Sequence, residues 1–259
     1  LAETGSPPKE DVLAALAAGD NLSGKDLRGA DLSRADLTGA SFREKDLTGA
    51  NFEGSILSGV DCTGATFSGA ILTGAKFSDT PLAGANLDGA AASGASFARA
   101  HLASANLSNC DFTGADFTGA DMTGATLSYS VFDGAVLSGT IMRKTSASGT
   151  RFMEADLSGA DFLGAQLPEA DFSGSTIEKT VFSGAILTNV WFSGAHGADA
   201  VFSGADMRTS RADGATSLPG ADFSGAILAY ARWADADRSG ARFHGDDLTG
   251  ASFMGCRFI

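Results

Sequence analysis

Cysteine, histidine, tryptophan and tyrosine are scarce in this sequence. Its 259 residues include 3 Cys, 3 His, 2 Trp and 2 Tyr. An odd, sparse set of cysteines without metal-ligand spacing argues against a disulfide framework and indicates a reducing compartment. We therefore expect a cytoplasmic protein, with export by a non-classical route as the alternative. The thiols of Cys62, Cys110 and Cys256 are all expected to be buried and inert.

Groups of residues that carry out chemistry are also missing. His101, His196 and His244 are far apart in the sequence, and no Gly-x-Ser-x-Gly motif, phosphate-binding loop or Cys-x-x-Cys pair is present. No stretch approaches the run of about 20 apolar residues that crosses a membrane. The sequence thus predicts a protein that is not an enzyme, with no catalytic, metal-binding or cofactor-binding residues, no cofactor and no membrane association.

Positive charge is in short supply. The chain has 18 Lys and Arg against 31 Asp and Glu, which gives a net charge of −13 and an isoelectric point near 4.5. This balance argues against direct binding to nucleic acid or to an anionic membrane. It is compatible with a basic protein partner, or with a protein site that normally takes nucleic acid.

What the sequence does have is 34 Gly, 18 Phe and a period of five residues. A central apolar residue, usually Leu or Phe, returns at every fifth position from Leu22 to Ala212. One residue is inserted around Ser217-Leu218, after which the frame continues to Phe258. Such internal periodicity dominates any other feature of the chain and predicts a solenoid.

The residues around each centre recur as well. A small residue stands two positions before the centre and Gly often stands two after it, as in Ala35-Asp36-Leu37-Thr38-Gly39. A period of five matches neither a helix (3.6) nor a strand (2.0). It fits a chain that turns a corner every five residues, with the centre and the small residue pointing inward. Gly at the corner supplies the positive φ that a type II turn requires.

The repeats Ala30-Asp31-Leu32-Ser33-Arg34 and Ala50-Asn51-Phe52-Glu53-Gly54 resemble the A(D/N)LXX motif of the pentapeptide repeat family. The resemblance extends from Asp20 to Ile259. It implies an all-β fold, a right-handed quadrilateral parallel β-helix with four repeats in each coil and about 12 coils. Coils stacked about 4.8 Å apart would form a rod roughly 58 Å long.

The sequence divides into three parts. Residues 1–8 form a linker, residues 9–19 a capping helix, and residues 20–259 the β-helix. Proline and acids precede and open the helix, Val12, Leu13, Leu16 and Ala17 supply its apolar face, and Gly19 ends it. Because the chain starts at Leu rather than Met, we expect a processed product or a fragment of a larger protein.

The C-terminal coil has no predicted cap. The sequence ends on a core position, so either another domain follows or two molecules meet end to end through Phe253, Phe258 and Ile259. A bare end would expose an apolar patch, and a homodimer through this coil is one of the two ways to cover it.

A step of twenty residues places side chains of successive coils in columns. One outward column is unusual because it carries Arg151, Asp171, Trp191, Arg211 and Arg232. An exposed Trp beside Arg permits a cation–π contact and has the composition of a binding hot spot. The column is therefore the candidate partner-binding surface, and an ordinary solvent-exposed wall is the alternative.

Three core positions break the pattern. Trp233 follows Ala212 in one column, which we interpret as compensation of a small centre by a large one rather than as a ligand platform. Arg238 falls on a core position and Asp246 on an inward one. Either these two form a buried ion pair or the register is distorted there.

Two functions are compatible with these features. The first is a rigid, non-enzymatic protein-interaction or spacer module, part of a larger bacterial protein such as one associated with secretion. The second comes from the family resemblance: quinolone-protection and gyrase-inhibitor members imitate duplex DNA in type II topoisomerases such as DNA gyrase. A duplex of about 58 Å carries roughly 34 phosphates, however, far more charge than this chain has.

Overall fold

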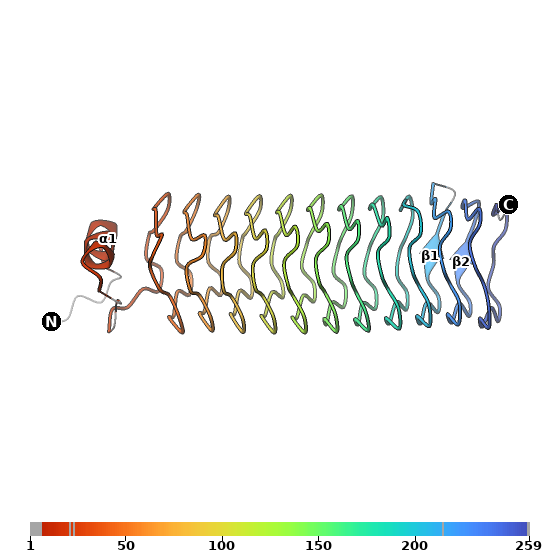
Figure 1. Ribbon diagram of the computed structural model, residues 1–259, viewed down its shortest axis with the longest axis horizontal. Helices are drawn as coiled ribbons and strands as arrows, with labels where there is room; N and C mark the ends of the chain where they lie inside the picture. The colour runs from red at the N-terminus through yellow and green to blue at the C-terminus, as the bar shows by residue number, and fades with distance from the viewer. Residues whose placement is uncertain (1–6, 21, 23, 214, 258–259) are drawn as a thin grey trace.

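The computed structural model describes residues 7–20, 22, 24–213 and 215–257. These residues form a rod of stacked coils, and helix α1 (Lys9–Ala17) lies at its N-terminal end (Figure 1). Two short strands, β1 (Arg211–Ala212) and β2 (Arg232–Trp233), pair in parallel near the other end. The predicted right-handed quadrilateral β-helix and its short N-terminal helix are confirmed.

Consecutive coils pair residue for residue at a step of twenty. Asp31 forms a parallel bridge with Asn51, and the same step continues along the rod. The column that begins at Asp31 takes one residue from each of twelve described coils, which agrees with the number predicted. Its members are Asp31, Asn51, Ile71, Ala91, Asp111, Val131, Arg151, Asp171, Trp191, Arg211, Arg232 and Ser252.

The single insertion lies slightly earlier than the sequence suggested. Trp191 pairs with Arg211 at a step of twenty, but His196 pairs with Ser217 at a step of twenty-one. The extra residue therefore belongs to the corner before Ser217. Leu218 is fully buried and keeps its place in the core. The core position is retained because burial of the centre fixes the register, and the exposed corner absorbs the added length.

Four of the five backbone N–H groups in a regular repeat donate to backbone carbonyls. In residues 50–54, Ala50 donates to the carbonyl three residues back at 3.0 Å, which closes the corner. Asn51 donates to the previous coil at 2.9 Å, and Phe52 and Gly54 donate to the next coil at 2.7 and 2.9 Å. Each coil is thereby joined to both of its neighbours, as strands are in a sheet.

Where Asp or Asn stands before the centre, the fifth N–H is satisfied by a side chain of the same repeat. The N–H of Glu53 donates to Oδ1 of Asn51 at 2.9 Å. This contact explains why Asp or Asn stands before the centre, since a short side chain with an acceptor oxygen reaches the N–H two residues on. The same contact is made by Asn86, Asn106, Asp31, Asp36, Asp46, Asp61, Asp111, Asp116, Asp121, Asp156, Asp161, Asp171, Asp222, Asp237 and Asp247.

The corners adopt the positive φ that was expected. Gly39 has a φ of 83°, and the equivalent corner residues Tyr129 and Lys144 have values of 61° and 56°. Side chains other than Gly are strained in this region, at a cost of about 1 kcal/mol each. The rod tolerates them because the hydrogen bonds between coils hold the corner in place.

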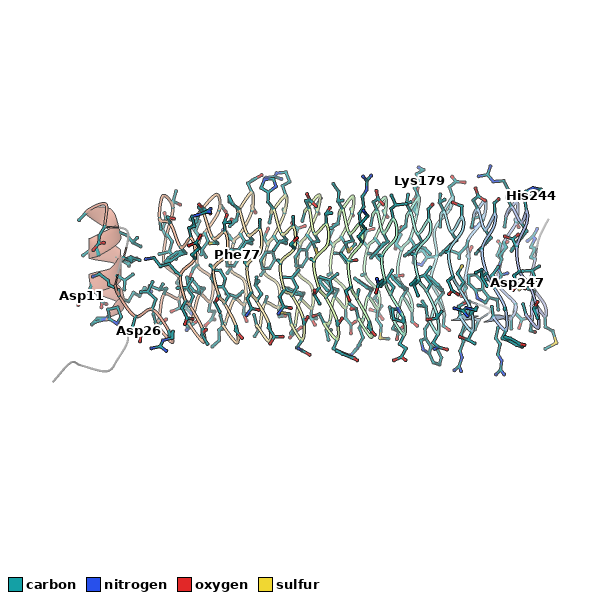
Figure 2. All side chains as sticks on the ribbon, turned by 90° about the horizontal axis from the view of Figure 1, so that it is seen from below. Asp11, Asp26, Phe77, Lys179, His244 and Asp247 are labelled. Atoms are coloured by element: carbon teal, nitrogen blue, oxygen red, sulfur yellow. The ribbon has the colours of Figure 1, made fainter. Side chains whose placement is uncertain are left out.

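The centres stack into columns that fill the interior. Phe152 and Phe172 are stacked with ring centroids 5.0 Å apart, and Phe162 and Phe182 with centroids 5.1 Å apart, close to the spacing of paired strands. All four side chains are fully buried. In Figure 2, Phe77 lies within the rod, whereas charged side chains project from its edges. Each buried Phe contributes about 1.5–3 kcal/mol relative to an exposed one.

Trp233 fills the space that a small centre leaves. Its side chain is fully buried, and its ring centroid lies 5.8 Å from that of Phe192, two coils away, across the level of Ala212. Its indole Nε1–H donates to Oγ of Ser210 at 3.0 Å. The interpretation of Trp233 as core packing that compensates for Ala212 is confirmed.

Helix α1 covers the first coil much as predicted, with one correction. Val12 is fully buried, and Leu13 and Leu16 pack partly buried against the core. Ala17 is exposed, and Ala15 packs against the core in its place. Residues three and four positions after Val12 share its face of the helix, whereas Ala17, five positions on, points away.

The side-chain caps predict the outcome of a matched pair of substitutions. We expect Asn51→Ala to lower the free energy of unfolding by about 1 kcal/mol, because one N–H loses its acceptor, as when a helix N-cap is removed. Asn51→Asp keeps the acceptor and should unfold at nearly the wild-type urea concentration. Equal losses in the two variants would show that the cap does not stabilise the corner.

The same caps make the rod sensitive to acid. The pKa values of Asp36, Asp222 and Asp237 are lowered from 3.8, first by the hydroxyl of the Ser or Thr two residues on and then by its N–H. A carboxyl whose pKa is lower in the folded state stabilises the fold above its ordinary pKa. We therefore expect the thermal midpoint to stay level from neutral pH down to about 5 and to fall as the pH drops through and below 3.8. A midpoint that rises in this range would contradict the assignment.

Candidate interaction surface

The five residues predicted to bind a partner lie in one column, as the step of twenty requires. Bridges join Arg151 to Asp171, Asp171 to Trp191 and Trp191 to Arg211, and β1 pairs Arg211 with Arg232. All five side chains are on the outer wall of the rod. The structure therefore places them together, but it gives the two halves of the column different surroundings.

The first two members are engaged in contacts of the rod itself. The guanidinium of Arg151 forms an ion pair with Asp133 of the previous coil. The carboxylate of Asp171 accepts the N–H of Ser173 at 2.9 Å and so caps its own corner. Arg151 is half exposed but already paired, and Asp171 is committed to its own corner.

The last three members form a compact cationic and aromatic surface, which we name the Trp191 cluster (Trp191, Arg211 and Arg232). Cζ of Arg211 lies 4.7 Å from the centroid of the Trp191 ring, so the expected cation–π contact is present. Trp191 is 43% exposed even with this neighbour in place.

Two open depressions adjoin the Trp191 cluster. The larger, of about 440 Å³, is lined by the three residues of the cluster together with Ser193, Ala212, Asp213, Trp233, Ala234 and Ser252. The other, of about 420 Å³, is lined by Glu169, Asn189, Trp191 and Arg211. The larger depression lies over the small centre Ala212 and next to the lengthened corner, where the wall of the rod is least regular.

Two exposed tyrosines flank the same wall and were missed in the sequence. Tyr129 and Tyr230 are 66% and 62% exposed and lie in the corner column two residues before the Trp191 column. Their rings cover glycines of the next coil, since a Cβ on Gly149 or Gly250 would lie 2.9 or 2.8 Å from ring atoms. Counting in steps of twenty, with one extra residue after Arg211, would have placed both in this column.

Arg238 lies in the core among aromatic rings. It is 1% exposed, and its Cζ lies 4.1 Å from the centroid of Trp233 and 4.7 Å from that of Phe253. Burial lowers the pKa of its guanidinium to about 10. The carboxylate of Asp246 accepts the backbone N–H of Ala226 at 3.0 Å. Cation–π contacts therefore stabilise a charge whose burial is otherwise costly.

The cysteines are buried in two cases of three. Cys62 and Cys110 are buried, and burial raises the pKa of the Cys110 thiol to about 12, which keeps it protonated and unreactive. Cys256 is only half-buried, so the prediction was wrong for this residue. It belongs to the last described coil, which has a neighbouring coil on one side only among the described residues.

The histidines lie on the outer walls, as expected. His101, His196 and His244 are exposed, and Nε2 of His196 lies 3.1 Å from Oγ1 of Thr176. No group of three or more potential metal ligands occurs in the part of the chain that the structure describes. Among the same residues, no helix has the length and apolar character needed to span a bilayer.

The C-terminal end of the rod presents apolar side chains. Leu248, a centre, is 43% exposed, and Phe253 is half-buried with its ring 6.2 Å from that of Phe243. The other two residues predicted to mediate end-to-end pairing, Phe258 and Ile259, lie outside the described residues.

Solved structures of similar proteins share the repeat at low identity. HetL from the cyanobacterium Nostoc sp. strain PCC 7120, involved in heterocyst differentiation regulation, is 25% identical over 96% of each chain, with a TM-score of 0.28. A trypsin-treated form of QnrB1, a plasmid-mediated fluoroquinolone resistance protein, is 21% identical over 89% of this chain and 87% of that one, with a TM-score of 0.36. A pentapeptide repeat protein of the Arabidopsis thaliana thylakoid lumen is 24% identical over 43% of this chain and 68% of that one, with a TM-score of 0.27.

With TM-scores below 0.5, these three structures do not indicate a function for this chain. No curated protein matches the chain. The profile of pentapeptide repeats, in contrast, matches in eight copies along nearly all of the rod. The matched residues are 21–44, 46–80, 82–119, 120–159, 143–174, 177–211 and 216–258. The chain therefore belongs to the pentapeptide repeat family.

Proposed function

We propose that this chain is a rigid, non-enzymatic module that binds or spaces protein partners along its walls, within a larger bacterial protein such as a secretion-associated one. The filled interior is the observation that carries the proposal. Columns of fully buried Phe, Leu and Ala occupy the inside of the rod, so other molecules meet only its outer walls and its ends. Buried thiols at Cys62 and Cys110 fit the reducing environment of the cytoplasm.

We further propose that a second copy pairs with the C-terminal coil. The exposed centre Leu248 and the half-buried Phe253 would be covered by an identical surface, and the free edge of the coil would find backbone partners there. Such pairing would double the length over which the module holds its partners.

Light scattering and small-angle X-ray scattering test both proposals. We expect a dimer whose longest dimension is about twice the roughly 58 Å of one rod. Phe253→Arg should yield monomers of single length, whereas Ile186→Arg, which changes an exposed residue in the middle of a wall, should remain dimeric. Circular dichroism checks that both variants are folded. A wild-type monomer would rule out end-to-end pairing, and a scattering curve typical of a flexible chain would rule out the rigid module.

The second candidate function is DNA mimicry toward a type II topoisomerase. The net charge of −13 favours it, as do the lowered pKa values of acids that repeat along the walls, which keep these carboxylates ionised at neutral pH. Several acids with lowered pKa values are also paired with arginines, for example Asp206 with Arg208 at 2.6 Å, which reduces the resemblance to a phosphate backbone.

A gyrase supercoiling assay tests this candidate. If the rod mimics DNA, the purified chain should inhibit or protect supercoiling at micromolar concentration, and the effect should weaken at high salt. A variant with Asn at the column of acids Asp36, Asp116, Asp156 and Asp237 loses four charges but keeps the corner caps, so it should be folded and much less active. Equal activity of this variant, or no effect of the wild type, would contradict DNA mimicry.

A further inference from the structure

The wall of the rod places two cations side by side at the Trp191 cluster. Arg211 and Arg232 are Cα partners in the pairing of β1 with β2, so their side chains leave the wall about 4.8 Å apart. Like charges directly opposite one another in paired strands destabilise the pairing. This juxtaposition is the starting point of the inference.

Several other arginines of the rod have an acid as a close neighbour. Arg242 is the β-bridge partner of Asp222, and Arg257 is that of Asp237. The guanidinium of the corner residue Arg99 forms an ion pair with Asp79 at 2.6 Å. Within the described residues, neither Arg211 nor Arg232 has a carboxylate within the 4 Å of an ion pair. Both guanidinium groups therefore retain hydrogen-bond donors for an anion, which would also relieve their mutual repulsion.

The larger depression beside these arginines is suited to an apolar side chain. Trp191 contributes an exposed ring to its lining, and the small side chain of Ala234 leaves room on the outer wall. An exposed Trp that is held in place by a stacked Arg is a preorganised contact surface. The surface thus combines a double cation with an apolar recess.

The surroundings favour a short acidic peptide over a polyanion. Asp213 lines the same depression, Glu169 lines the neighbouring one, and the chain as a whole carries a charge of −13. A nucleic acid would bring many charges into this negative field, whereas a peptide needs to bring only one carboxylate to the two arginines.

We propose that the Trp191 cluster binds an acidic peptide segment of a protein partner, with one carboxylate between Arg211 and Arg232 and a neighbouring apolar side chain in the recess between Trp191 and Ala234. The inference rests on the proposed interaction module and specifies its partner. The bidentate donors of the two arginines select the carboxylate, and the recess selects the residue beside it.

Fluorescence anisotropy with a short labelled peptide that carries one Glu next to one Phe among Gly and Ser residues tests the proposal. We expect saturable binding to the wild-type chain and a loss of affinity of about tenfold or more in the double variant Arg211→Gln/Arg232→Gln. The double variant Arg242→Gln/Arg257→Gln removes the same charge from arginines that face acids, so it should bind within about twofold of wild type. No binding to wild type, or an equal loss in both double variants, would overturn the proposal.

Further probes examine each part of the recognition. The same peptide with Gln in place of its Glu should bind far more weakly, and so should a short labelled DNA duplex. A peptide with Lys in that place should not bind the cluster. Binding of the acidic peptide should also protect Trp191 from quenching by acrylamide. Tight binding of the Gln peptide, the Lys peptide or DNA, or unchanged quenching of Trp191, would show that the site is not the one proposed.

A measurement without peptide tests the repulsion between the two arginines. Arg232→Gln should raise the thermal midpoint of the rod, because it removes a like-charge contact, whereas Arg242→Gln should lower it slightly or leave it unchanged. A lower midpoint for Arg232→Gln would contradict the premise. If the peptide fails to bind while scattering still reports a rigid rod, the interaction module remains and only its assigned partner is wrong.

Discussion

The rod depends on hydrogen bonds between the backbones of consecutive coils. A regular repeat uses four of its N–H groups for carbonyls, one within its own corner and three in the coils before and after it, and Asp or Asn before the centre supplies an acceptor for the fifth. Because an unsatisfied backbone group is costly wherever water is excluded, the carbonyl pattern recurs along the rod. The period of five is its consequence, and so is the preference for Asp or Asn before the centre.

The same hydrogen bonds between coils determine which side chains are neighbours on the outer walls. Side chains of one column lie about 4.8 Å apart along the whole rod, so any pair of neighbours in a column is also a contact pair. Opposite charges in such positions stabilise neighbouring coils weakly, as with Arg99 and Asp79. Equal charges at Arg211 and Arg232 run against this trend. Recognition sites in a filled solenoid arise from such local departures, since the interior has no space for a ligand.

Irregularity in the core and irregularity on the wall occur at the same place. The small centre Ala212, the lengthened corner before Ser217 and the far-reaching ring of Trp233 all lie under or beside the Trp191 cluster. A regular stack presents nearly identical corners at every level. The depression beside the Trp191 cluster lies at this level, next to the lengthened corner, and the arginines that line it supply polar contacts.

The sequence by itself determined the fold, the columns and the length of the stack, because its period of five specifies inward and outward positions without reference to any distant contact. It also predicted that Trp233 compensates for Ala212, since both fall in one column of the core. Only the tertiary structure decided which arginines are already paired, that Arg238 lies among aromatic rings, and that Ala17 and Cys256 are not fully covered. These outcomes depend on side-chain rotamers and on what lies beyond the last coil, which no repeat period encodes. On the outer walls, a side chain can contact any of several neighbours. Its actual partner could therefore be found only from the tertiary structure.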